Sequence, residues 1–141
     1  MSKMEKLLKI PYNAFNDWNS LQKFLNLRGN PRYELVGDVN LFGRQDIFDL
    51  GNLVRVYGHL DLRWSSIESL GVLEYVENYL NLNYMPIESL GNLKYVGGNL
   101  YLMYSSIQSL ENLEYVGSNV YLSEDHQIPP EQLTKFHIIS V

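Results

Sequence analysis

The feature that most constrains the fold of this chain is an internal repeat of 20 residues. Three copies, 58–77, 78–97 and 98–117, align without a gap and share the pattern x-x-L-x-L-x-x-x-x-I-x-S-L-x-x-L-x-Y-V-x. An earlier copy fills the same apolar positions from Val39 to Val56 with one extra residue, and a fifth begins at Val120. Because one 20-residue unit is too short to bury its own apolar face, the copies are expected to stack on one another.

The spacing of apolar residues within a repeat predicts the shape of each coil. Leucines at alternate positions, as in Leu60 and Leu62, have the period of a strand with one buried face. The apolar residues that follow recur every three positions, which favours a return path of turns, short extended pieces or 3₁₀ turns over a long helix. The repeat therefore predicts one short strand per copy, and a short right-handed solenoid of about five coils with one parallel sheet.

The segment from Ser89 to Leu102, SLGNLKYVGGNLYL, resembles leucine-rich repeats. It is most similar to the variant with a V-x-G-x-L-x-L joint, which is found in receptor L-domains and in repeat proteins of bacteria, large viruses and phages. The resemblance covers residues 35–128, about two thirds of the chain. It implies an α/β solenoid fold, and it implies much less about function, because function depends on the site carried by the fold.

The two ends of the solenoid need caps, since an open end would expose the apolar core and unpaired strand backbone. We expect a single domain with an N-terminal cap over residues 1–34, repeats over 35–128 and a C-terminal cap over 129–141. In the first cap, the sequence predicts a helix at about 16–27 that begins at Asn16 or Asp17.

The C-terminal cap is predicted to be short and helical. Pro129 and Pro130 end the repeat, and the residues from Glu131 to His137 are long enough for one or two helical turns. Leu133 and Phe136 would then face the last coil.

Charge and composition exclude several kinds of site. The net charge of −5 divides into +2 over residues 1–63 and −7 over residues 64–141, so phosphate recognition by the second part is disfavoured. The absence of cysteine excludes disulfides, thiol nucleophiles and thiolate metal sites. We find no signal peptide and no apolar run long enough to span a bilayer, so we expect a cytoplasmic protein, in the host cytoplasm if it is viral.

No residue pattern points to catalysis or to a cofactor. His59, His126 and His137 are not spaced to share a metal ion or to activate a nucleophile. Glu68 and Glu88 recur on successive copies, and we interpret them as a solvated rim in preference to a carboxylate pair of the glycosidase kind. We therefore expect a protein that is not an enzyme and needs no cofactor or metal.

The residues that flank the strand leucines are expected to point out of the sheet and to form a binding face. This face is rich in Trp and Tyr and lacks Lys, which is typical of protein interfaces. The candidate partner-binding residues are Trp64, Tyr84, Tyr104, Tyr101, Tyr121, Tyr79, Arg63, Asp61, Met103 and Glu124. A structural ladder of stacked rings remains the alternative, because Tyr75, Tyr95 and Tyr115 also repeat.

The sequence therefore favours a protein–protein interaction module that binds one protein partner through this face. Similarity to phage repeat proteins implies a concrete form, an inhibitor of a host nucleic-acid-processing or defence enzyme, with the acidic C-terminal half acting as a nucleic-acid mimic. The alternatives are a carbohydrate or small-ligand binding protein and a self-assembling structural protein, for which a homo-oligomer is expected. Direct nucleic-acid binding and membrane binding are disfavoured.

Overall fold

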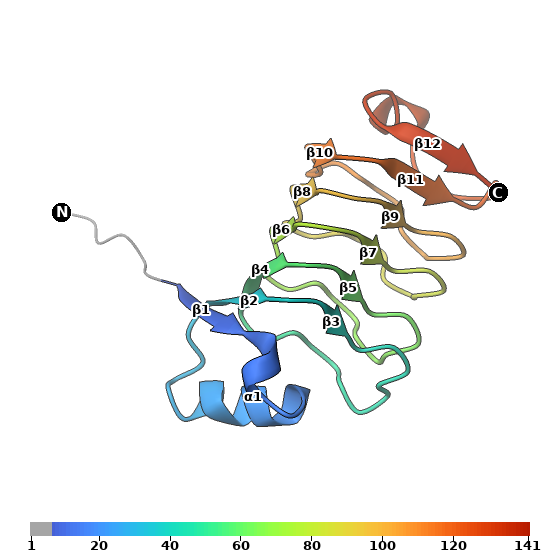
Figure 1. Ribbon diagram of the computed structural model, residues 1–141. Helices are drawn as coiled ribbons and strands as arrows, with labels where there is room; N and C mark the ends of the chain where they lie inside the picture. Colours follow the sequence, from blue (N-terminus) through green and yellow to red (C-terminus); the bar gives the residue numbers. More distant parts are fainter. Residues whose placement is uncertain (1–6) are drawn as a thin grey trace.

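The computed structural model describes residues 7–141, which wind into a β-solenoid of about five coils with one α-helix at its N-terminal end (Figure 1). The strands of the sheets, in chain order, are β1 (Leu8–Pro11), β2 (Tyr33–Val36), β3 (Val39–Asn40), β4 (Leu53–Tyr57), β5 (Leu60–Asp61), β6 (Tyr75–Val76), β7 (Leu80–Asn81), β8 (Tyr95–Val96), β9 (Leu100–Tyr101), β10 (Tyr115–Val116), β11 (Asn119–Leu122) and β12 (His137–Ser140). All pairings between these strands are parallel.

Each full coil contributes two short strands, and this corrects the prediction of one strand per repeat and one sheet. Sheet A has the order β1-β2-β4-β6-β8-β10, and sheet B has the order β12-β11-β9-β7-β5-β3. The Tyr-Val pairs that form sheet A, such as Tyr75 and Val76, are only two residues long and are too short to show alternation in the sequence. They become strands because stacking places each pair beside its counterpart in the next coil, as Tyr75 lies beside Tyr95.

The core is a continuous column of the repeated aliphatic residues. The strand leucines Leu60, Leu62, Leu80 and Leu82 are completely buried, and the return path adds Ile67 and its counterparts. Burying one such side chain contributes about 1.5–3 kcal/mol, so the repeated apolar positions supply most of the driving force for stacking.

Helix α1 (Trp18–Asn26) lies at the N-terminal end of the solenoid, inside the range 16–27 for which the sequence predicts a helix. Asp17 is the N-cap, because its carboxylate accepts a hydrogen bond from the backbone amide of Ser20. Trp18, Leu21 and Leu25 are buried on the face that packs against the first coil. Strand β1, which the sequence did not predict, lies beside β2 and covers the edge of sheet A.

The C-terminal cap differs from the prediction of one or two helical turns at Glu131–His137. A single 3₁₀ turn spans Pro130–Gln132, and the chain then adds β12 to the edge of sheet B by pairing with β11. Two adjacent β-branched residues, Ile138 and Ile139, favour this extended ending. Leu133 and Phe136 are partly buried and pack against the core.

Candidate interaction surface

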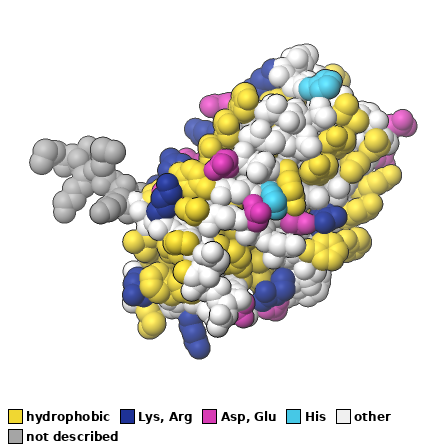
Figure 2. All heavy atoms as spheres, in the orientation of Figure 1, with side chains coloured by type: hydrophobic (Ala, Val, Ile, Leu, Met, Phe, Trp, Pro, Cys, Tyr) yellow, Lys and Arg dark blue, Asp and Glu magenta, His cyan; other side chains and the backbone are white. Residues whose placement is uncertain are grey.

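The outer face of sheet B carries the predicted binding residues in columns that run from coil to coil. The strand register places Asn40, Asp61, Asn81, Tyr101 and Tyr121 side by side in successive coils. Residues that follow each strand form further columns beside this one. Figure 2 shows hydrophobic side chains gathered beyond the ends of β5, β7 and β9, at the right of the view.

The most exposed of these columns consists of Trp64, Tyr84 and Tyr104, which we call the aromatic column. The Trp64 and Tyr84 rings are stacked with centroids 5.4 Å apart, and the Tyr84 and Tyr104 rings are stacked at the same centroid distance. The three residues remain 51%, 49% and 60% exposed. Three large rings are therefore held in a fixed array with about half of their surface in contact with solvent.

The backbone under the aromatic column has an unusual conformation. Trp64, Tyr84 and Tyr104 have φ angles of 59°, 64° and 57°, which lie in the left-handed region. Residues with a Cβ rarely adopt this region, and glycine adopts it without steric cost. The corresponding residue of the preceding coil is Gly43, with φ of 74°. The fold thus places three aromatic residues where its own backbone favours glycine.

Two further pairs of stacked rings lie in or next to the strands and are half-buried. His59 stacks on Tyr79 with centroids 4.2 Å apart, and Tyr101 stacks on Tyr121 at 5.0 Å. The Tyr101 hydroxyl accepts a hydrogen bond from the Asn99 side-chain amide at 3.0 Å. These rings are held by neighbours on several sides, so they support the surface more than they project from it.

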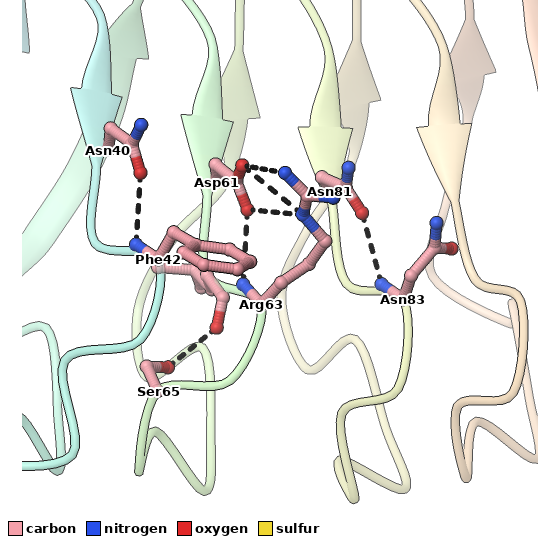
Figure 3. A network of polar contacts seen from close by, with 8 residues as sticks. Asn40, Phe42, Asp61, Arg63, Ser65, Asn81 and Asn83 are labelled. Atoms are coloured by element: carbon pink, nitrogen blue, oxygen red, sulfur yellow. Dashed lines mark hydrogen bonds and ion pairs between the residues drawn. The ribbon is translucent and has the colours of Figure 1, made fainter.

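Asp61 is the predicted surface residue that the structure buries. It is 3% exposed, because the Arg63 guanidinium covers it with two hydrogen bonds, Nε to Oδ1 at 3.0 Å and Nη2 to Oδ2 at 2.7 Å (Figure 3). These bonds raise the pKa of Arg63 above its usual value. Asp61 also accepts from the Arg63 backbone amide at 3.1 Å, a turn that Asn81 repeats with Asn83 in the next coil. Asp61 therefore fixes Arg63 and is not available to contact a partner.

The two remaining predicted residues lie near the C-terminal end of this face. Met103 is half-buried, and its backbone amide donates to the Asn83 side-chain oxygen at 2.8 Å. Glu124 is exposed and follows Tyr104 in the same position of the next coil. The structure thus brings the ten predicted residues onto one face, with exposure concentrated in the aromatic column and Glu124.

Two features of this face were not predicted from the sequence. Phe42 is 50% exposed beside the first coil, and the Arg63 guanidinium lies 4.9 Å from its ring centroid. A groove of about 430 Å³ runs between the last two coils and is lined by Tyr104, Gln108 and Asp125 among others. The sequence signal for the groove was the break of the fifth repeat after Leu122, where the chain leaves the repeat pattern.

Sheet A provides a comparison for the aromatic column. Tyr75, Tyr95 and Tyr115 stack at centroid distances of 4.6 and 4.8 Å, and we call them the tyrosine ladder. They lie within strands, and their φ angles are not positive. A stack of rings on this solenoid therefore forms without a left-handed backbone.

Among residues 7–141 no three His, Asp or Glu side chains lie close enough together to hold a metal ion. Within the same range no helix is both long and apolar enough to cross a bilayer. Comparison with known proteins adds no family: no family model, no curated protein and no solved structure matches the chain.

Proposed function

We propose that the protein is a non-enzymatic interaction module that binds one protein partner through the outer face of sheet B. The observation that carries the proposal is the left-handed backbone at Trp64, Tyr84 and Tyr104. Large rings at such positions, half exposed on one face, have the composition and rigidity of interface hot spots.

An energy comparison supports binding over a purely structural ladder. Each left-handed residue with a side chain costs about 1–2 kcal/mol. Each stacked pair contributes about 0.5–1.5 kcal/mol, and three residues form only two pairs. Ring stacking alone therefore does not exceed the backbone cost of the aromatic column, and backbone strain of this kind is typical of functional sites.

We infer two further details from the resemblance of the repeats. The coils are those of a right-handed leucine-rich-repeat solenoid, which the repeated Leu60 and Leu62 positions support. The similarity to phage repeat proteins supports a phage-encoded inhibitor of a host enzyme or defence complex as the concrete form of the module.

Capture from a cell lysate tests the proposal. The bait proteins are the wild type, the double variant Tyr84→Gly/Tyr104→Gly and the matched control Tyr95→Gly from the tyrosine ladder, with bound proteins identified by mass spectrometry. We expect one protein to be retained by the wild type and the control and lost by the double variant. Equal retention by all three baits, or retention of glycan or nucleic acid alone, would contradict the proposal.

A further inference from the structure

The carboxylates of this protein differ in their partners along the solenoid. In the first coils, Glu34 pairs with Arg55 at 3.1 Å, Asp46 with Arg44 at 2.9 Å and Asp61 with Arg63 at 2.7 Å. From Trp64 onward the chain has only two cationic residues, Lys94 and Lys135, against nine acidic residues. The acidic side chains Glu68, Glu88, Glu124 and Asp125 form no ion pair with any residue in the range 7–141.

Glu124 and Asp125 follow Leu122 at the C-terminal end of the aromatic column, and Glu68 and Glu88 lie on the return path, four residues after Trp64 and Tyr84. Glu68 and Glu88 line one shallow groove, and the backbone amide of Gln108 donates to the carbonyl oxygen of Glu88 at 3.0 Å, so the three form a row across successive coils. Gln108 in turn lines the 430 Å³ groove together with Tyr104 and Asp125. The acidic row and the aromatic column therefore meet at this groove, where Gln108 continues the row and Tyr104 ends the column, and we call the two together the strip.

The two parts of this strip attract the same kind of group. An aromatic ring attracts a cation to its face, and arginine stacks on rings more often than lysine. Tyr104 has no ring contact other than Tyr84 in the described part of the chain, so its second face is not covered by another ring. Asp125 lines the same groove and can accept two hydrogen bonds from a planar guanidinium.

We propose that the segment of the partner that occupies this strip is arginine-rich. One guanidinium lies in the groove between Tyr104 and Asp125, and further cationic side chains pair with Glu88 and Glu68. Successive coils are about 4.8 Å apart, the spacing between paired strands, so the acidic row offers closely spaced contacts to an extended cationic peptide. This inference rests on the proposed function, because it specifies the chemistry of the partner at the same face.

A synthetic peptide tests the inference without the natural partner. The probe is Ac-(Gly-Arg)6-NH2, and the control is the same peptide with citrulline, which keeps the shape of arginine and removes its charge. Titration is followed by tryptophan emission at low salt, because Trp64 is half exposed in the column whereas Trp18 is 2% exposed in the N-terminal cap. We expect the arginine peptide to bind at least about tenfold more tightly than the citrulline peptide.

Three variants test whether the peptide binds at the strip. Tyr104→Ala, Glu88→Gln and Asp125→Asn should each weaken binding at least about threefold. Glu114→Gln makes the same change in charge at an exposed residue before β10 of sheet A and should leave binding unchanged. The affinity of each variant for the peptide is also measured by isothermal titration calorimetry. This second measurement does not depend on the emission of Trp64.

Equal affinity for the two peptides would overturn the inference, as would arginine binding that Glu88→Gln and Glu114→Gln weaken equally. The arginine peptide could fail to bind while capture of a protein still depends on Tyr84 and Tyr104. In that case the inference of an arginine-rich segment is wrong and the proposed function stands. If the capture is insensitive to the aromatic column, the proposed function itself fails.

Discussion

Gly43 and Trp64 occupy the same position of successive coils and share a left-handed backbone, with φ angles of 74° and 59°. The first coil shows which residue this turn favours, and the next three coils replace it with Trp64, Tyr84 and Tyr104. The rings therefore occupy their positions at a cost in backbone energy that their stacking only offsets.

The central ring of the column provides a direct test of this cost. Tyr84→Ala and Tyr84→Gly both remove the stacking with Trp64 and Tyr104, but only the glycine relieves the left-handed backbone. We expect Tyr84→Gly to be about 1 kcal/mol more stable than Tyr84→Ala in urea denaturation. An alanine variant as stable as the glycine variant would show that the backbone at this position is not strained.

Gly97 lies at the corner between the two strands of a coil, β8 and β9, and we expect its replacement by alanine to lower the stability strongly. A Cβ placed on Gly97 would overlap the carbonyl oxygen of Glu77 in the preceding coil, so Gly97→Ala forces the two coils apart. We expect a loss of about 2 kcal/mol in the free energy of unfolding, the range of overpacked cores. Ser118→Ala, at an exposed corner of the last coil, is the control and should change stability by less than about 0.5 kcal/mol.

The lowered pKa values of two carboxylates, Glu34 and Asp46, lead us to expect that the protein loses stability in acid. Burial raises the pKa of Glu34, but hydrogen bonds from Tyr57 and Arg55 outweigh it and hold the pKa below its ordinary 4.5. The hydrogen bonds from Arg44 lower the pKa of Asp46 to about 2. Because both pKa values are lower in the folded state, the stabilisation is complete above about pH 4.5 and is lost as the pH falls toward 2.

Urea midpoints measured between pH 6 and pH 2 check this expectation. Glu34→Gln should flatten the decline below pH 4.5, because the glutamine has no proton to bind. A decline of the same steepness in wild type and variant would show that Glu34 does not contribute to it.

The acidic row predicts a gain in stability when one charge is removed. Glu68 and Glu88 lie on adjacent coils and line the same groove, so they repel each other. Glu88→Gln should raise the free energy of unfolding by less than about 0.5 kcal/mol at low salt, and the gain should disappear at high salt. A destabilised variant would indicate that the Glu88 carboxylate has a favourable partner in the free protein.

The sequence predicted the stacking of coils because Leu60, Leu62 and their counterparts alternate with a strand period and recur every 20 residues. It did not predict sheet A or β12, because a two-residue strand such as Tyr75–Val76 has no period of its own and β12 is defined by its pairing with β11. The burial of Asp61 depends on the position of Arg63, which spacing does not reveal.

The candidate site was predicted in part. The outward position of Trp64, Tyr84 and Tyr104 followed from their place after the strand leucines, whereas their left-handed φ angles did not follow from any local pattern. The alignment of Gly43 with Trp64 was the available signal, and the extra residue between Leu41 and Ile47 obscured it.

The affinity of the captured partner for wild type and for Tyr84→Gly/Tyr104→Gly tests the central claim most directly. Glycine fits the backbone at both positions, so this double variant should keep a cooperative unfolding transition and a folded sheet B. If the aromatic column is the binding site, the dissociation constant should rise at least about 30-fold, equivalent to about 2 kcal/mol, while Tyr95→Gly leaves it unchanged. An unchanged dissociation constant for the folded double variant would contradict the claim that these strained rings are there to bind a partner.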